Sequence, residues 1–550
     1  MTLTRLLFVG LLMCSGTVAA ATIRVESSRP GAIASALKTL QPGDTLILAE
    51  GVYRESIDFR TTGLVRTQEA GPRTRVEAAR GAKPIIKGSD LVTGWEKVRD
   101  NVYAKRDWSV SSQQVFIDDQ PLKQIGGDIY GDFPSNPKHK FAALHKSQGG
   151  IWPKRIAGDQ NNLVDESFYY DAEAKTLYIK TAADLTRRHV VEVSTRPYLV
   201  FGSGVSDITL SGLRFAHSNT TSVSQSGAIT LIGDRLVLEN LDVRHADGAG
   251  FDISGNDNMV RQSVANYCGI IGMKVRGRRA QVLDNETSFN NTRGFNKWWE
   301  AGGAKFVGDG GLQDSEVAGH RAYANQGDGL WFDWHNDNNR IHRNVAARNT
   351  GMGIHYEASR RAFIYDNYVV GNGQRGIYLP NASESVVAHN LIAANGMEAL
   401  AIVDERRARE QGPKELIPVD NTVVGNVLAW NGKAALVLPD SGAASNRSEA
   451  NYFVSERTPT LSLGWPSRER PLAQGLDAWR KVSSQDRHSQ QKTASSSEFP
   501  VAKGSDVADD AQDLQRWQSW LSQADLPRVP ADLGVESEFA RPNTTVGPAL

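Results

Sequence analysis

The chain has 550 residues, in which 62 lysines and arginines balance 62 aspartates and glutamates, so its formal net charge at pH 7 is zero. Such a chain has no general positive field to attract nucleic acid or an anionic membrane, and we expect neither as a partner. Its length exceeds one ordinary globular core, yet glycine is abundant (51) and proline-rich linkers are scarce. An elongated repeat protein fits both observations.

Residues 1–20 have the pattern of a secretory signal. Arg5 precedes an apolar run, and small residues at 18–20 form a cleavage site. The methionine before Cys14 disfavours a lipid-modified cysteine, so we expect simple cleavage and export to the periplasm or the outside. Cleavage would leave Cys268 alone, without a disulfide partner. No later segment approaches the roughly 20 apolar residues that cross a bilayer, so no membrane insertion is expected.

Residues 21–90 carry the first signals of regular structure. Residues 32–40 have the pattern of a short amphipathic helix, and residues 45–49 that of a strand. We assign 21–90 to an N-terminal cap and the first coils of the fold derived below, because the end of a repeat fold must cover its unpaired strand edges.

Residues 91–195 lack the repeat that follows. Segments 114–118 and 169–179 are rich in aromatic and β-branched residues and suggest hairpins. We assign 91–195 to a small inserted β subdomain.

Residues 196–455 contain a repeat of about 23 residues, marked by two asparagines five residues apart. The pairs are Asn285/Asn290, Asn344/Asn349, Asn367/Asn372, Asn390/Asn395 and Asn426/Asn431. Other residues fill these slots at Asn240/His245, Ser263/Cys268 and His320/Asn325. The pairs follow one another at one regular step, except for two insertions of roughly a dozen residues, each expected to be a loop on one face.

A small residue and a short alternating segment follow most second slots, as in GLWFD at 329–333, GIHYE at 353–357 and GIYL at 376–379. Period-two alternation is typical of a strand with one buried face, and the unit is too short for a strand plus a crossover helix. Each repeat is therefore one coil of short strands. The predicted fold class is all-β, a right-handed parallel β-helix with an inserted small β subdomain.

This fold makes two structural predictions. Residues 200–455 should form at least eight stacked coils, with Asn344, Asn367 and Asn390 in one column where side-chain amides bond from coil to coil. The asparagines are then structural, and Cys268 is a packed turn residue. Beyond 456 the chain turns polar, and we expect this C-terminal extension (456–550) to wrap the solenoid or to be partly disordered.

The register also places two carboxylates in one outward column, Asp333 on one coil and Glu357 on the next. Adjacent strands lie about 4.7–4.9 Å apart, and two carboxylates so close on a solvent-facing sheet repel, which raises the pKa of one. The spacing is near the roughly 5–5.5 Å of retaining glycosidases. The alternative is an ordinary surface pair neutralised by Arg276 or Lys305. We predict Asp333 and Glu357 as catalytic residues.

Aromatic and charged side chains beside this pair suit a sugar, whose rings offer C–H faces edged by hydroxyls. The expected substrate-binding residues are Lys274, Arg276, Glu300, Lys305, Trp331, His355 and Tyr378. Glu300 follows Trp298 and Trp299 in the first long insertion, which either folds over the carboxylates or simply packs on its own aromatics. Replacing Lys305 or Trp331 should change stability by less than about 0.5 kcal/mol if both face solvent.

These segments resemble carbohydrate-active β-helix proteins, especially the β-xylosidases of glycoside hydrolase family 120 and the related family 141. The likeness rests on EAGGAKF at 300–306, GLWFDW at 329–334 and GIHYE at 353–357, and on FIDD at 116–119 in the hairpin region. It implies a nucleophilic Asp333 and an acid/base Glu357. The segment 358–360, Ala-Ser-Arg, departs from the family's Asn-His-Gly, so xylose specificity is not carried over.

We therefore expect an exported, monomeric enzyme that cleaves a polysaccharide or oligosaccharide, most simply a retaining glycoside hydrolase, with no cofactor and no metal. Two alternatives stay open. A polysaccharide lyase acting on a uronate-containing glycan would use the basic residues and Tyr378 to neutralise the uronate and take its proton. A non-catalytic glycan-binding β-helix protein would explain the aromatics but not the stacked carboxylates.

Overall fold

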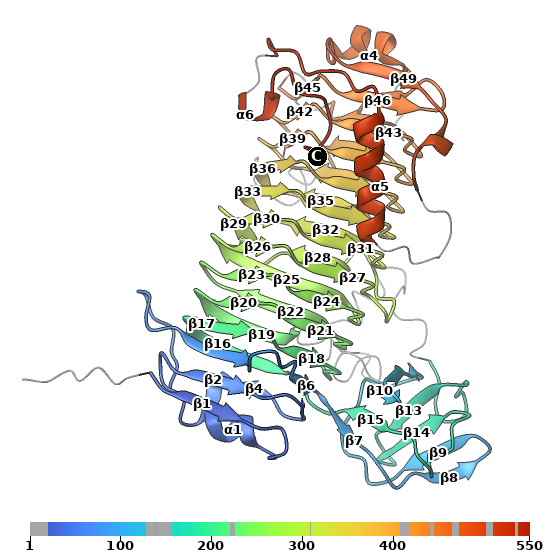
Figure 1. Ribbon diagram of the computed structural model, residues 1–550. Coiled ribbons are helices and arrows are strands. Elements are labelled where there is room, and N and C mark those ends of the chain that lie inside the picture. Colours follow the sequence, from blue (N-terminus) through green and yellow to red (C-terminus); the bar gives the residue numbers. More distant parts are fainter. Residues whose placement is uncertain are drawn as a thin grey trace, which may run out of the picture.

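The computed structural model describes residues 20–127, 138, 157–220, 226–308, 310–406, 417–440, 445–464, 472–501, 510–533 and 537–549. The predicted signal segment, apart from its last residue, lies outside the described residues. Within them the chain winds into a long solenoid of stacked coils, with a small β subdomain beside its N-terminal end (Figure 1). Three stacks of parallel strands form its walls, so the predicted parallel β-helix is confirmed.

The first sheet carries the candidate site. Its parallel strands are β4 (Ile57–Asp58), β16 (Val200–Ser206), β19 (Gly227–Asp234), β22 (Ala249–Ser254), β25 (Ile271–Arg278), β28 (Gly302–Phe306), β32 (Asp328–Asp333), β35 (Ile354–Glu357), β38 (Ile377–Pro380), β41 (Leu400–Val403), β44 (Leu436–Leu438) and β47 (Thr460–Leu463), and β48 (Ala473–Gln474) closes it antiparallel.

The second sheet follows the first along each coil, and β25 joins the two by pairing with β29. Its strands are β1 (Thr22–Val25), β2 (Thr45–Leu48), β5 (Thr74–Ala78), β17 (Ile208–Ser211), β20 (Val237–Glu239), β23 (Met259–Arg261), β26 (Gln281–Leu283), β29 (Leu312–Gln313), β30 (Glu316–Ala318), β33 (Asp337–His342), β36 (Arg360–Tyr365), β39 (Val386–Ala388), β42 (Thr422–Val424) and β45 (Arg447–Glu449).

The third sheet completes each coil. Its strands are β3 (Val52–Tyr53), β6 (Ile85–Lys87), β18 (Arg214–Ala216), β21 (Asp242–Arg244), β24 (Val264–Asn266), β27 (Glu286–Ser288), β31 (Arg321–Tyr323), β34 (Val345–Ala347), β37 (Tyr368–Val370), β40 (Leu391–Ala393), β43 (Val427–Ala429), β46 (Tyr452–Ser455) and β49 (Gln490–Thr493). The ten strands from β18 to β46 lie between 200 and 455, which confirms the prediction of at least eight coils.

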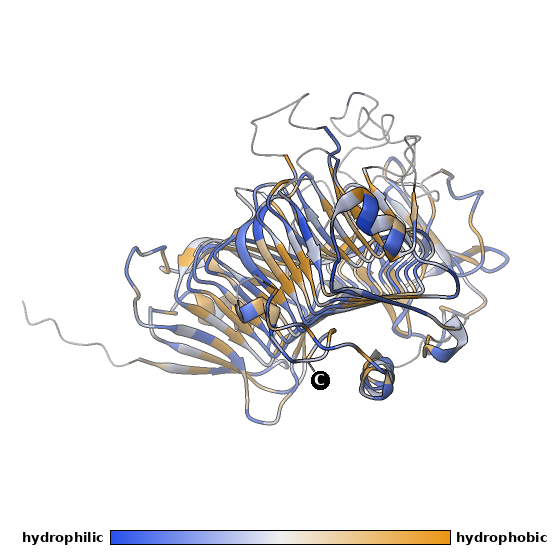
Figure 2. Ribbon diagram, turned by 90° about the horizontal axis from the view of Figure 1, so that it is seen from above, coloured by the Kyte–Doolittle hydropathy of each residue, from blue (hydrophilic) through white to orange (hydrophobic). Residues whose placement is uncertain are grey.

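Apolar side chains fill the inside of the coils because alternate residues of each strand point inward. Leu330 and Phe332 on β32, and Ile354 and Tyr356 on β35, are all fully buried in one continuous core, as the alternation predicted. Figure 2 shows this apolar colouring along the stacked strands. The core holds the strands in register, and that register fixes the outward columns.

Asparagine ladders run along the turns. The backbone N–H of Asn344 donates to Asn367 Oδ1 at 3.0 Å, and that of Asn367 donates to Asn390 Oδ1 at 2.9 Å, which confirms the predicted column. Cys268 occupies a slot as predicted, because its N–H donates to Asn290 Oδ1 at 2.9 Å and its side chain is buried.

The prediction that Asn240 and His245 occupy ladder slots is wrong, because the slot lies one residue later in the chain. The N–H of Leu241 donates to Ser263 Oγ, so Leu241 holds the ladder position. Asn240 and His245 instead take left-handed turn conformations, with φ of 53° and 51°. An apolar residue can occupy the slot, but its side chain does not continue the amide ladder. The spacing of the asparagines alone therefore does not show where such a slot lies.

Two small sheets lie outside the solenoid. They contain β7 (Ser89–Leu91), β8 (Glu96–Arg99), β9 (Val102–Lys105), β10 (Val115–Ile117), β11 (Gln120–Pro121), β12 (Lys123–Gln124), β13 (Ser167–Asp171), β14 (Thr176–Lys180) and β15 (Val191–Ser194). The predicted hairpins are present, because β10 pairs antiparallel with β11 and β13 with β14. Phe168, Leu177 and Ile179 give these sheets a core of their own.

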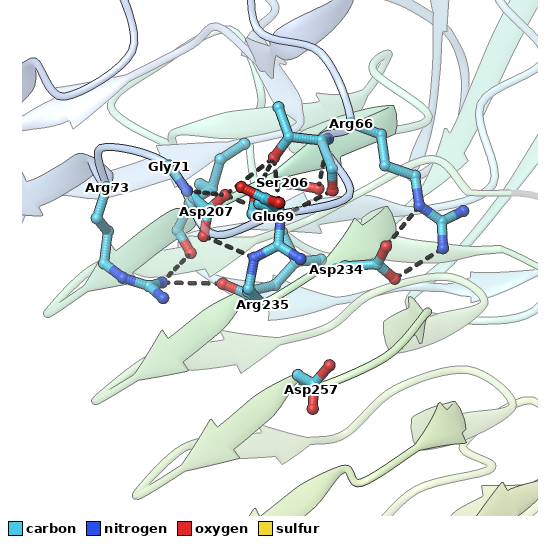
Figure 3. A network of polar contacts seen from close by, with 12 residues as sticks. Arg66, Glu69, Gly71, Arg73, Ser206, Asp207, Asp234, Arg235 and Asp257 are labelled. Atoms are coloured by element: carbon cyan, nitrogen blue, oxygen red, sulfur yellow. Dashed lines mark hydrogen bonds and ion pairs between the residues drawn. The ribbon is translucent and has the colours of Figure 1, made fainter.

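Helix α1 (Ala32–Leu37) and β2 lie at the N-terminal end, close to where the sequence predicted a helix and a strand. A loop after a 3-10 turn (Phe59–Thr61) is held against the neighbouring coils by charged side chains (Figure 3). Arg66 binds Asp234 at 2.6 Å, and Arg235 binds Asp207 at 2.9 Å while also donating to backbone carbonyls of the loop. These contacts attach the loop to the first coils.

The C-terminal extension folds back along the solenoid (Figure 1). It contains α4 (Leu476–Ser483), a 3-10 turn (Ser496–Glu498), α5 (Asp510–Gln523) and α6 (Ser537–Ala540). Trp517 and Leu521 of α5 are buried against the third sheet, and Tyr323 donates to Asp513 at 2.8 Å. No helix in the described part of the chain has the length and apolarity to span a membrane.

Candidate active site

One outward column of the first sheet gathers polar and aromatic side chains over successive coils. The strand pairings align Phe201, Thr230, Asp252, Lys274, Lys305, Trp331, His355 and Tyr378. Lys305 joins the column although an insertion precedes it, because β28 pairs Lys274 with Lys305 and Lys305 with Trp331. The register of the column therefore continues across the first long insertion.

A cleft of about 710 Å³ lies over this column. Its lining includes both predicted catalytic carboxylates and most of the expected binding residues: Lys274, Arg276, Trp298, Trp299, Glu300, Lys305, Trp331, Asp333 and Glu357. His355 and Tyr378 do not line it, and their assignment to substrate binding stays a prediction. Tyr378 donates instead to Glu405 and packs beside apolar side chains.

Asp333 and Glu357 are direct neighbours on β32 and β35. Burial raises the pKa of the Asp333 carboxyl above its usual value, Lys305 opposes the rise, and Glu357 adds to it. Oδ2 of Asp333 lies 3.0 Å from Lys305 Nζ, whereas buried Oδ1 has no hydrogen-bond partner among the described residues. One oxygen is thus held by Lys305, and the other is buried without a hydrogen bond among the described residues.

Lys305 connects three parts of the site. Its Nζ donates to the backbone carbonyl of Trp299 at 2.6 Å, binds Asp333, and lies 3.4 Å from the centre of the Trp331 ring. A lysine so placed favours the ionised form of Asp333 and holds the loop that carries Trp299 and Glu300 against the sheet.

A second group of charges lies farther along the cleft. Lys274 Nζ lies 2.8 Å from Glu300 and 3.8 Å from Asp252, and Arg276 binds Asp252 at 2.7 Å. The carboxylates raise the pKa of Lys274 against the opposing effect of its burial, so it stays charged. The insertion therefore folds onto the sheet and brings Glu300 to Lys274. This agrees with the predicted arrangement in which the loop covers the site.

Glu357 is approached from behind by one hydrogen-bond donor, Trp331, and by the ring of His355, whose Nε2 makes no hydrogen bond among the described residues. Trp331 Nε1 donates to Glu357 Oε2 at 2.8 Å, and His355 Nε2 lies 3.4 Å from the same oxygen. The other ring nitrogen of His355, Nδ1, lies 2.9 Å from Asp328 Oδ2. Burial alone would lower the pKa of His355, but Asp328 and Glu357 outweigh it and the pKa lies above its ordinary value.

The expectation that these side chains face solvent is wrong. Lys274, Lys305, Trp331 and Glu357 are each only 5–6% exposed. The side chains do point out of the coil, but the Trp298–Glu300 loop and their mutual contacts cover them. Because Lys305 and Trp331 are buried, replacing either one should change the stability of the fold by more than the small amount expected for a solvated side chain.

Several residues of this site were missed from the sequence. Asp252 neutralises Arg276, Asp328 binds His355, and Phe201 with Thr230 lines the far end of the cleft. Extending the column alignment backwards through the repeats at 22-residue steps would have found Asp252 and Thr230. Asp328 is the residue before the small residue of its coil, and no pattern marked it.

Comparisons with known proteins agree with this architecture. Residues 199–392 and 312–459 match the family model described as the right-handed beta helix region. The fold is that of right-handed β-helix proteins. One similar right-handed β-helix structure, of XylC in complex with xylose, has a TM-score of 0.54 at 14% identity and covers 88% of each chain. Another, a glycoside hydrolase, has a TM-score of 0.50 at 12% identity and covers 78% of this β-helix chain and 96% of its own.

No curated protein matches the sequence. At identities this low, the two solved structures establish the β-helix fold and leave the chemistry to be argued from this chain's own residues. The resemblance found in the sequence is confirmed at the level of that fold.

Proposed function

We propose that this protein is a carbohydrate-active enzyme, a retaining glycoside hydrolase that uses Asp333 and Glu357. The observation that supports the proposal most is their pairing on adjacent strands in the wall of a polar, tryptophan-lined cleft. Parallel strands are about 4.8 Å apart, close to the carboxyl separation of glycosidases that pass through a covalent intermediate. The similar structures of XylC and of a glycoside hydrolase share the fold and are compatible with this activity.

Asp333 is suited to attack the anomeric carbon. Lys305 holds one of its oxygens and favours the carboxylate, and the other oxygen has no partner among the described residues. Attack forms a bond from a carboxylate oxygen of Asp333 to the anomeric carbon and breaks the bond to the leaving oxygen, which needs a proton. Glu357 supplies that proton, and later takes one from the water that hydrolyses the intermediate.

The lyase alternative is weaker because its cations are already paired. A lyase needs a free positive group to neutralise a uronate, but Lys274 binds Glu300, Arg276 binds Asp252 and Lys305 binds Asp333. A bound uronate would displace a carboxylate from one of these buried pairs, and leaving a buried charge unpaired is costly. The cleft therefore favours an uncharged sugar at this position.

The test is a panel of polysaccharides and aryl glycosides, assayed for new reducing ends and for unsaturated uronate. On a cleaved glycan, Asp333→Asn should lower kcat by at least about a thousandfold. Glu357→Gln should be severe on the natural glycan but mild on an activated aryl glycoside, which needs little protonation of its leaving group. Asp314→Asn, an exposed carboxylate on the turn between the second-sheet strands, is the matched control and should behave as wild type.

Near-wild-type activity of either site variant on the natural glycan would remove that residue from the mechanism. Unsaturated products would support the lyase instead. Binding without any product from the whole panel would support the non-catalytic glycan-binding protein.

A further inference from the structure

Behind Glu357 lie two titratable side chains, Asp328 and His355, that the hydrolase mechanism does not require. Asp328 opens β32, and its Oδ1 accepts the backbone N–H of Met352 at 2.8 Å. Its Oδ2 lies 2.9 Å from His355 Nδ1, and His355 Nε2 lies 3.4 Å from Glu357 Oε2. All three residues are buried.

The geometry fixes how protons are distributed among Asp328, His355 and Glu357. A carboxylate only accepts hydrogen bonds, so Asp328 requires the proton on Nδ1 of His355. Nε2 then faces Glu357 either as a lone pair or, in the imidazolium, as an N–H. The ring cannot turn away easily, because it stacks at 5.0 Å on Trp331 and lies 5.2 Å from the ring of Tyr378.

Other charged groups around the imidazole reinforce this arrangement. Asp333 on β32 adds a second negative charge from the same side as Asp328. Across the ring, Tyr378 on β38 lies between His355 and Arg375, whose guanidinium sits 4.4 Å from the Tyr378 ring centre. Tyr378 in turn donates to Glu405, and Lys305 lies on the far side of Trp331. The charged groups nearest to His355 are therefore the carboxylates of Asp328 and Glu357.

We propose that Asp328 positions His355, and that His355 shares the acid proton with Glu357. In one state the proton is on Glu357 and Nε2 accepts; in the other it is on Nε2 and Glu357 is a carboxylate. Transfer from Nε2 to Glu357 leaves a neutral imidazole that keeps its Nδ1–H bond to Asp328, so no proton is gained or lost. The raised pKa of His355 is consistent with this sharing.

The shared proton would serve catalysis by Glu357, and this part of the inference rests on the proposed function. Glu357 must hold a proton for the leaving oxygen and then act as a base, while the unprotonated Asp333 lies on the neighbouring strand. A proton stored on His355 keeps the acid supplied above the pH at which an isolated glutamate would be ionised.

The first experiment does not depend on activity. In protein labelled with ¹⁵N-histidine, His355 is identified by its loss in His355→Gln, and its two ring nitrogens are followed from pH 5 to 9. We expect Nδ1 to stay protonated throughout and Nε2 to titrate. In Asp328→Asn the amide can offer an N–H to Nδ1, so the neutral ring should switch to the tautomer with its proton on Nε2.

In Glu357→Gln, the titration midpoint of Nε2 should fall by about one pH unit or more because a negative neighbour is lost. Asp366→Asn is the matched control: Asp366 is also buried and paired, with Arg541 at 2.6 Å, but it lies on the turn between second- and third-sheet strands. It should leave both nitrogens of His355 unchanged. A neutral wild-type ring with its proton on Nε2, or a midpoint indifferent to Glu357→Gln, would overturn the proposal.

The second experiment uses a cleaved glycan. Asp328→Asn should lower kcat and move the basic limb of the kcat/KM profile to lower pH, since His355 can no longer accept the proton of Glu357. An unshifted basic limb in a folded variant would contradict the sharing. If no glycan is cleaved while the nitrogens behave as expected, the hydrolase proposal fails and the shared proton stands.

Discussion

At the residue scale, Lys305 opposes the rise that burial gives to the pKa of Asp333, the candidate nucleophile. It lies between Asp333, the Trp331 ring and the carbonyl of Trp299, and all of these contacts are buried. The sequence predicted its column through the alternation of the repeats. It did not predict the burial, because the loop that covers the column comes from an insertion outside the repeat.

We expect Lys305→Met to destabilise the fold by about 3–5 kcal/mol, because it leaves Asp333 as a buried, unpaired charge. The pKa of Asp333, already raised by burial, should rise further without the lysine that lowers it. The acidic limb of activity should therefore move to higher pH. Urea unfolding and a pH–rate profile measure these effects.

Lys433→Met, at an exposed lysine, is the matched control and should change stability by less than about 0.5 kcal/mol. If Lys305→Met were as harmless as this control, Lys305 would be a surface residue of the kind first expected from the sequence.

At the scale of one coil, the asparagine ladder was predictable because its residues recur with the period of the fold. The same period placed His320 in an asparagine slot, and its N–H donates to Asn344 Oδ1 at 2.8 Å. Burial lowers the pKa of His320 to about 3, and Nε2 is 2.8 Å from Thr287 Oγ1.

This histidine makes the fold sensitive to acid. It stays neutral in the folded chain, whereas the unfolded chain takes up its proton near pH 6.5, so its contribution to stability is present above pH 6.5 and is lost as pH falls toward 3. Replacing His320 by the ladder's asparagine should remove this loss.

The stability of His320→Asn relative to wild type should improve by about 1.4 kcal/mol for each pH unit below 6. Denaturant unfolding at pH 8, 6 and 5 measures it. A constant difference between the two proteins across this range would show that His320 is not held neutral.

At the scale of the whole molecule, the solenoid separates the candidate site from the C-terminal helix. The cleft lies over the first sheet, and α5 packs on the third. The sequence indicated a C-terminal extension at 456–550 but not where it would dock. The surface that receives it is formed by outward side chains of the third sheet, such as Tyr323 and Tyr368, which look like ordinary strand residues in the repeat.

Trp517→Ala should cost about 3–5 kcal/mol locally, because Trp517 is 1% exposed and its removal leaves a cavity under α5. We expect faster hydrogen exchange in α5 with little change in the strands of the first sheet or in activity. Gln515→Ala, an exposed change on the same helix, should leave exchange unaltered. Equal loss of protection throughout the solenoid would show that helix and coils unfold as one unit.

The central claim for the whole molecule is that paired carboxylates cleave a glycosidic bond with retention. It is tested most directly by the anomeric configuration of the first product, followed by proton NMR before mutarotation on whichever glycan is cleaved. The close pairing of Asp333 and Glu357 on adjacent strands predicts a new reducing end with the configuration of the substrate. A product of inverted configuration, or an unsaturated uronate, would contradict the account.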